Sequence, residues 1–267
     1  MSVDVNKVYI ILRKEWSEVF KNRFVFFTVA FLPLLLTALP LIMLYVAQTS
    51  DDLGGSLISD MPTGFAALCG AMSDRECGQY FIVNQFMMLF MLLPLIIPVT
   101  IASYSIVGEK TTRTLEPVLA TPITTFELLA GKALAAAIPA VVASWLGFAI
   151  FAVGAHLIAT SPVVLSRLFE PLWVMAIFII GPLLSIAAVS VAVMVSSRVN
   201  DPRVAEQLSM LVILPLLAAF FGQVIGLFFI NEKIIIWMAI GLLVVDIGLL
   251  AFATHLFQRE TILTRWK

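Results

Sequence analysis

Charged residues are missing from five long stretches of this chain, and a sixth stretch contains only one. Each stretch exceeds the roughly 20 residues that cross the hydrocarbon core of a bilayer as a helix. Because backbone polar groups in lipid must be paired within the segment, these stretches predict helices and not isolated strands. The uncharged stretches are Phe24–Ser50, Cys77–Gly108, Ala133–Ser166, Pro171–Ser197 and Gln207–Asn231, and the sixth, Ile234–Phe257, is interrupted by Asp246.

A helical pattern of a different kind precedes the first stretch. Apolar residues between Val5 and Phe20 recur at helical spacing, and lysines and arginines occupy the other face. Asp4 is the expected N-cap of this helix. We therefore predict an amphipathic interfacial helix within residues 1–23, lying in the headgroup layer of the membrane. A short cytosolic helix packed on a partner would show the same pattern.

The distribution of positive charge predicts the orientation of the spans. With a cytoplasmic N-terminus, thirteen lysines and arginines lie inside and three lie outside, as the positive-inside rule requires. The expected fold is an all-α integral membrane protein of the plasma or inner membrane, with six transmembrane helices and both termini cytoplasmic. The inner residues are Lys7, Arg13, Lys14, Lys21, Arg23, Lys110, Arg113, Lys132, Arg198, Arg203, Arg259, Arg265 and Lys267, and the outer residues are Arg75, Arg167 and Lys233.

These spans imply a simple division of the chain. The interfacial helix, residues 1–23, is followed by a six-span domain, residues 24–257, and by a cytoplasmic tail, residues 258–267. Glycines around Gln223 leave open either a broken or re-entrant helix or a plain one near the end of the fifth span. The expected connections are an outer loop 47–79, an inner loop 108–127, and short outer loops at Leu157–Glu170 and Asn231–Lys233.

Composition agrees with a membrane protein and excludes a nucleic-acid partner. Hydrophobic residues make up 61% of the chain and charged residues 12%, which is too little charge to cover a water-facing surface. The net charge of −1 provides no basic field for nucleic acid.

The two cysteines, Cys69 and Cys77, both lie in the predicted outer loop. In an oxidising compartment they could close a small disulfide loop. Two free thiols near the membrane surface are the alternative. Neither has a His or Cys neighbour at metal-ligand spacing, so we expect no metal site.

The inner loop carries the most specific pattern. Glu109–Glu116 can form a short amphipathic helix, and Pro117 and Pro122 limit its continuation. Thr124 and Glu127 have the spacing of a capping box that starts the third span.

The loop resembles the membrane subunits of type-2 ATP-binding-cassette (ABC) exporters. The resemblance extends to the N-terminal helix and to the six spans. Val118 stands where the family has leucine, and Thr112-Arg113 where it often has Arg-Gly. The matching residues are Glu109, Thr114-Leu115-Glu116, Val118-Leu119-Ala120-Thr121-Pro122, Glu127-Leu128-Leu129-Ala130-Gly131-Lys132 and Arg13-Lys14-Glu15.

The resemblance implies a permease driven through a coupling helix by a separate cytosolic ABC ATPase, which would bind ATP and Mg²⁺. A second copy or a homologue of the chain is also implied. Leu115 would be a buried anchor and charged residues would form pairs around it. The implied contact residues are Glu109, Lys110, Arg113, Thr114, Leu115 and Glu116.

The chain lacks an ATPase motif of its own. Gly131-Lys132 is the only Gly-Lys pair, and Phe126 stands where a phosphate-binding loop needs its first glycine. We therefore expect no cofactor in this chain and no enzymatic activity of its own.

Three polar residues inside the spans are candidates for the transport pathway. Asp246, near the centre of span six, could line the pathway, bind a cation, pair with a polar neighbour or be a protonated or hydrogen-bonded carboxyl at a helix interface. Asn84 and Gln85 could line a pathway entrance or be interfacial.

The expected cargo is hydrophobic or amphipathic, since few charges line the spans. Two other hypotheses for the function remain open. One is a secondary transporter or channel with no ATPase, and the other is an ABC permease that uses ATP mechanically without exporting a solute. An intramembrane enzyme is disfavoured, because His156 and His255 should lie at opposite membrane faces and no matching serine or metalloprotease motif is present.

Overall fold

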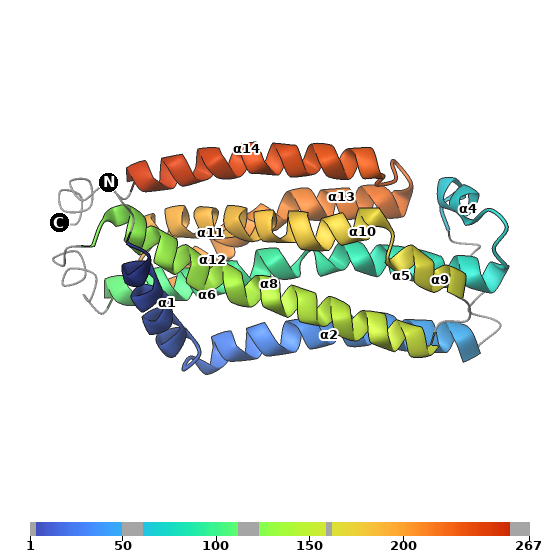
Figure 1. Ribbon diagram of the computed structural model, residues 1–267, viewed down its shortest axis with the longest axis horizontal. Helices are drawn as coiled ribbons and strands as arrows, with labels where there is room; N and C mark the ends of the chain where they lie inside the picture. Colours follow the sequence, from blue (N-terminus) through green and yellow to red (C-terminus); the bar gives the residue numbers. More distant parts are fainter. Residues whose placement is uncertain (1–3, 50–60, 112–122, 159–161, 257–267) are drawn as a thin grey trace.

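The computed structural model describes residues 4–49, 61–111, 123–158 and 162–256, and these residues form helices and turns without any strand. Six helical segments within these described ranges are long and apolar enough to cross a membrane, which confirms the predicted number of spans. They run side by side along the long axis of the molecule (Figure 1). The segments are Val25–Thr49, Asp74–Thr111, Phe126–Ile158, Pro162–Arg198, Pro202–Ile225 and Glu232–Ala253.

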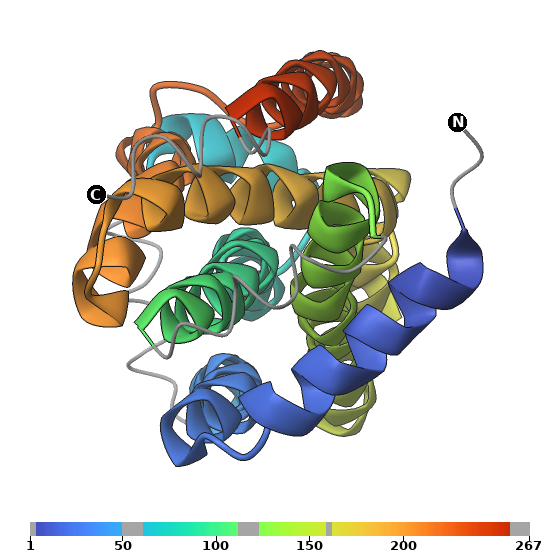
Figure 2. The same ribbon diagram turned by 90° about the vertical axis from the view of Figure 1, so that its left-hand side faces the viewer.

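The predicted N-terminal helix is α1 (Val5–Val19), and a short turn joins it to α2 (Arg23–Thr49). The Asp4 side chain accepts a hydrogen bond from the backbone N–H two residues further on, so the predicted N-cap is confirmed. Helix α1 crosses one end of the bundle, where it packs on α8 (Thr125–Ile158) and on α6 (Leu93–Thr111) (Figure 2).

The face of α1 that packs on the bundle differs from its predicted apolar face. Tyr9 and Val5 are 61% and 75% exposed, whereas Glu15 is 2% exposed. The helix is therefore rotated so that one flank of the apolar face remains at the surface while a carboxylate points inward. The buried residues of α1 are Ile11, Leu12, Glu15 and Val19.

The second span is the most enclosed of the six and consists of two helices. Its most apolar window is 78% buried, against 11% in the sixth span. Helix α5 (Asp74–Phe90) ends before a turn at residues 91–92, after which α6 begins with Pro94 in its first turn. Proline has no N–H and restricts the residue before it, which explains a break at this point.

The fourth span starts earlier than predicted. Most of the loop expected at Leu157–Glu170 is helical, because α8 extends to Ile158 and a short helix follows residues 159–161. Pro182 lies at the start of the last helix of this span, and the turn before it is π-helical, with the Gly181 N–H donating to the carbonyl of Ala176. The elements are α9 (Pro162–Leu168), α10 (Pro171–Met175), η1 (Ala176–Ile180) and α11 (Gly181–Arg198).

The fifth span ends earlier than predicted. Gly226 adopts a left-handed conformation, with φ of 81°, and caps the helix as glycine does at this position. Residues 226–231 form the connection, so the predicted loop at Asn231–Lys233 is displaced, and the described residues contain no re-entrant helix here. The elements are α12 (Pro202–Ser209), η2 (Met210–Ile213), α13 (Leu214–Ile225) and α14 (Glu232–Leu256).

Candidate functional site

Only some of the predicted coupling residues lie in the part of the chain that the structure describes. Arg113, Thr114, Leu115 and Glu116 lie outside the described residues. Glu109 and Lys110, by contrast, form part of the last turn of α6 and not of a separate short helix.

The far end of the same loop has the predicted capping box. The Thr124 N–H donates to Oε2 of Glu127 at 2.8 Å, and the Glu127 N–H donates to Oγ1 of Thr124 at 3.2 Å. These reciprocal bonds satisfy two backbone donors at the start of α8.

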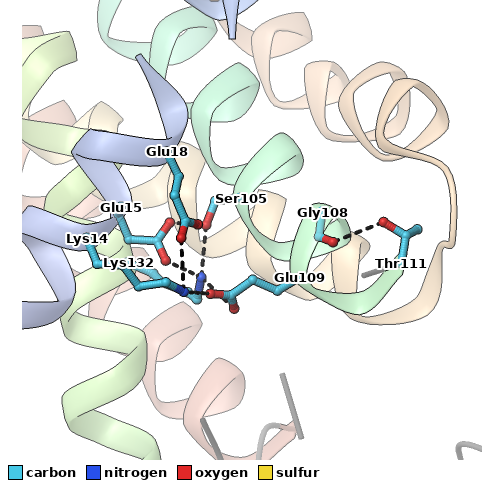
Figure 3. Close-up of polar contacts among 8 residues, drawn as sticks. All are labelled: Lys14, Glu15, Glu18, Ser105, Gly108, Glu109, Thr111 and Lys132. Atoms are coloured by element: carbon cyan, nitrogen blue, oxygen red, sulfur yellow. Dashed lines mark hydrogen bonds and ion pairs between the residues drawn. The ribbon is translucent and has the colours of Figure 1, made fainter. Parts of the chain in front are cut away.

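A buried ammonium group joins three helices next to these loop ends. Nζ of Lys132, on α8, lies 2.6 Å from the carboxylate of Glu15 on α1 and 2.9 Å from that of Glu109 on α6. It also donates to Oγ of Ser105 at 2.9 Å, and Ser105 in turn bonds Glu15. Figure 3 shows the group, to which Lys14 also belongs. We call Lys14, Glu15, Ser105, Glu109 and Lys132 the inner ionic cluster.

Lys14 closes the cluster from the solvent side. Its side chain is 39% exposed, pairs with Glu109 and lies 3.7 Å from Glu18. Partial burial works to lower the pKa of Lys14, but the hydrogen bond and the attraction of the Glu109 carboxylate outweigh it and raise that pKa. The cluster therefore contains two ammonium groups against two buried carboxylates, and its charges balance.

Further contacts fasten α1 along the first turns of α8. The Asp4 N–H donates to Oε1 of Glu127 at 3.0 Å, and the Trp16 indole donates to the carbonyl of Ala135 at 3.0 Å. Between these bonds the helices approach closely at Gly131, where an added Cβ would lie 2.7 Å from the side chain of Ile11. Lys7 adds an ion pair of 4.0 Å with Glu127.

The other side of α6 is fastened to the fourth and fifth spans. Nζ of Lys110 donates to the carbonyls of Ser197 and Val199 at 3.4 and 3.2 Å, where a cation suits the C-terminus of α11. Oγ1 of Thr100 donates to Oε1 of Glu206 on α12 at 2.7 Å.

These contacts give Glu109 and Lys110 a role within the chain. Both were predicted to contact an ATPase, but both have partners within the chain, and Glu109 is only 5% exposed. A carboxylate at that burial needs a cation beside it, which Lys132 provides. The two residues hold the end of α6 in place, and their contact with an ATPase stays a prediction.

The pathway candidates are not brought together in one open site. Asn84 accepts a hydrogen bond of 2.9 Å from Nε2 of Gln223, which links α5 to α13. Gln85 is 8% exposed, and neither polar atom of its side chain has a hydrogen-bond partner among the described residues. Asp246 lies on another helix, α14, and is 3% exposed.

The opposite end of the bundle has a covalent link. Cys69, the last residue of α4 (Thr63–Cys69), forms a disulfide with Cys77 in the first turns of α5, with a Cα–Cα distance of 5.4 Å. The ring of Phe65 on α4 packs against those of Tyr80 and Phe229, at centroid distances of 5.1 and 5.9 Å. Part of the predicted outer loop 47–79 is therefore helical and fixed to the bundle.

Sequence reasoning missed the inner ionic cluster as a site. Lys14 and Lys132 entered as positive charges of the predicted inner side, and all of Lys14, Glu15 and Lys132 entered as residues of the family motifs, but no contact between them was predicted. The sequence did contain a sign of this cluster. Its three motif fragments together carry charges of both signs, and the predicted topology places all three fragments on the cytoplasmic side. The pairing itself, which joins residues 117 positions apart, could not be derived from one sequence.

Among the residues that the structure describes, no group of three or more His, Cys, Asp and Glu side chains could hold a metal ion. Comparison with curated proteins finds no match to this chain. Residues 9–235 match the family described as ABC-2 family transporter protein. This match covers most of the described helices and both flanks of the inner loop. The chain is a multi-pass membrane protein that belongs to the ABC-2 transporter family.

Proposed function

We propose that the chain is the permease subunit of an ABC exporter that moves a hydrophobic or amphipathic cargo out of the cytoplasm or the inner leaflet. Membership of the ABC-2 family supports a permease that works with an ABC ATPase, and disfavours a secondary transporter or channel. ATP and Mg²⁺ would be bound by the partner. An assembly that uses ATP mechanically, without exporting a solute, is the second candidate.

The inner ionic cluster is the observation that supports coupling. It joins α1 to the two helices that enter and leave the inner loop, through the pairs of Lys132 with Glu15 and Glu109. A displacement of the loop by a partner would therefore move the ends of α6 and α8 together with α1. Lys110 and Thr100 would extend this movement to α11 and α12.

The direct contact with the ATPase is assigned to residues 112–122. Leu115 would be its apolar anchor, and Arg113, Thr114 and Glu116 would contribute contacts around that anchor. Glu109 and Lys110 have a positioning role, because they hold the loop where it leaves α6.

The orientation follows from the charges at the two ends. Both termini and the inner ionic cluster would face the cytoplasm of a cell whose plasma or inner membrane holds the protein. Helix α1 would then lie at the water–lipid boundary, with the exposed Val5, Tyr9 and Ile10 toward apolar surroundings. A second copy or a homologue would complete the pathway.

The test is co-expression of the chain with a candidate ABC ATPase from the same genome, followed by purification through the permease and measurement of ATP hydrolysis. We expect a stable complex, and we expect Leu115→Asp to abolish co-purification or coupled ATP hydrolysis, since a charge in a buried contact leaves an unpaired group.

The matched control is Val204→Asp, which introduces the same charge at an exposed apolar residue of α12. We expect this variant to keep its ATPase. The coupling assignment is wrong if both variants behave alike, or if no ATPase co-purifies with the wild-type chain.

A further inference from the structure

Helix α14 is attached to the rest of the molecule along one narrow stripe. Six of its buried and half-buried residues follow each other at spacings of four and three, the period of a helix–helix seam. Ile234 and Met238 are also half-buried and lie beside this series, and the residues on the opposite face are exposed. The stripe packs mainly on α11, with smaller contacts to α10, η1 and α8. Its members are Ile235, Ala239, Leu242, Asp246, Leu249 and Ala253.

Asp246 is the one polar side chain in this stripe, and it lies near the middle. It is 3% exposed, and neither carboxyl oxygen has a hydrogen-bond partner among the described residues. A stripe that holds a span in place usually consists of apolar residues, so a buried acid at its centre requires an explanation.

Charged and titratable groups of the surrounding helices lie only at their ends. Helices α10 and η1 contain none, and no ion pair with Asp246 is present in the described part of the chain. The groups at the ends of the packed elements are Glu127 and Lys132 at the start of α8, His156 at its other end, Arg198 at the end of α11, Glu232 and Lys233 at the start of α14, and His255 near the end of α14.

An ionised carboxylate in this position would be buried in a low-dielectric environment with neither a cation nor a hydrogen-bond donor beside it. The cost of such a charge far exceeds that of burying a neutral carboxylic acid, so a group without partners takes up a proton. We propose that Asp246 is a proton-binding site that carries its proton while α14 is packed on α11.

Proton binding is then linked to the packing of the sixth span. If α14 separates from α11 and water enters the seam, the carboxyl can ionise at ordinary pH. The bound proton stabilises the packed state, and this contribution is lost as the pH rises and the proton leaves. Any movement that opens this seam would release one proton per chain, and reclosure would take one up.

Infrared difference spectroscopy tests the proton directly. Wild-type protein and Asp246→Asn are compared in lipid nanodiscs over a series of pH values. We expect the carbonyl stretch of an un-ionised carboxylic acid in the wild type at neutral pH, its absence in Asp246→Asn, and its conversion into carboxylate absorption as the pH rises. Carboxylate absorption from Asp246 at neutral pH would overturn the proposal.

The matched control is Glu232→Gln, which removes an exposed acid at the start of the same helix. Its difference spectrum should show only carboxylate at neutral pH. Asparagine has the size of aspartate and no charge, so Asp246→Asn should keep the fold, which gel filtration and circular dichroism verify. Asp246→Glu, which restores an acid, should restore the carboxylic-acid band.

Thermal unfolding tests the linkage. The midpoint of the wild type should fall with rising pH relative to that of Asp246→Asn. If the unfolding midpoints of the two proteins depended on pH in the same way, a proton that stabilises the packed state would be contradicted. Neither measurement involves an ATPase, so both remain decisive whether or not the proposed function is correct.

Discussion

Single charges decide how the end of this molecule that carries α1 is arranged. Lys132 is 4% exposed and forms ion pairs with the carboxylates of Glu15 and Glu109, which are buried to a similar extent. Replacement of a whole buried ionic group by apolar residues is often tolerated, whereas removal of one partner leaves an uncompensated charge. The cluster therefore specifies one arrangement of α1, α6 and α8 more than it adds to their stability.

We expect Lys132→Met to lower the free energy of unfolding by about 3–5 kcal/mol, because Glu15 and Glu109 would lose their buried cation. The measurement is thermal or denaturant unfolding in detergent. Addition of Glu15→Gln and Glu109→Gln to the same chain should recover part of the loss, since the two negative charges then disappear as well.

Lys14→Met is the control for this prediction. Lys14 is 39% exposed and also pairs with Glu109, but its loss would leave Glu109 paired with the buried Lys132, so we expect a smaller loss of stability than for Lys132→Met. Equal effects of the two substitutions would show that burial does not distinguish the two ammonium groups.

At the scale of the elements, the close approach of α1 and α8 depends on a residue without a side chain. The backbone of Gly131 faces Ile11, and the hydrogen bonds of Asp4 and Trp16 lie on either side of this contact. Helices can approach this closely only where a small residue lies at the crossing point. The glycine of the family motif is thus explained by packing and not by phosphate binding.

Gly131→Val should push α1 away from α8, because even a Cβ would lie 2.7 Å from the Ile11 side chain. Overpacking of this kind costs about 1–3 kcal/mol. Hydrogen–deuterium exchange of the α1 amides should become faster, and Ile11→Ala in the same chain should reverse the change.

The matched control is Gly241→Val on α14, where nothing lies within 4 Å of an added Cβ. Exchange in α1 should stay at the wild-type rate. Slow exchange in Gly131→Val would mean that α1 is held mainly by its polar contacts.

Some structural elements of this protein can be predicted from its sequence alone, and others cannot. Long uncharged stretches and the period of Val5–Phe20 predicted six spans and α1, because composition and spacing alone decide these features. The turn at residues 91–92 has a local cause in Pro94, whereas the pattern of charged and apolar residues does not predict the π-helical turn or the position of α9. The motifs likewise located the loop, but not the partners of Glu109 and Lys110, which depend on contacts between helices.

At the scale of the whole molecule, the two ends of the bundle are built differently. One end has α1, the flanks of the inner loop and the inner ionic cluster, and the other has α4, α9 and the disulfide (Figure 1). The first end depends on charge pairs between helices, whereas the second depends on aromatic packing and a covalent bond. The proposed orientation puts the ionic end in the cytoplasm and the disulfide in an oxidising compartment, where such bonds persist.

This orientation predicts which surface a reagent can reach. The native cysteines are joined to each other, so a cysteine added elsewhere is the single thiol available to a maleimide in unreduced protein. Ser166 is exposed on α9 at one end, and Asn200 is exposed between α11 and α12 at the other. A membrane-impermeant maleimide applied to intact cells should label Ser166→Cys, and should label Asn200→Cys only after the membrane is opened. The reverse pattern would place the inner loop outside the cell, away from ATP, and would exclude the proposed contact with a cytosolic ATPase even though the fold and the family stayed as described.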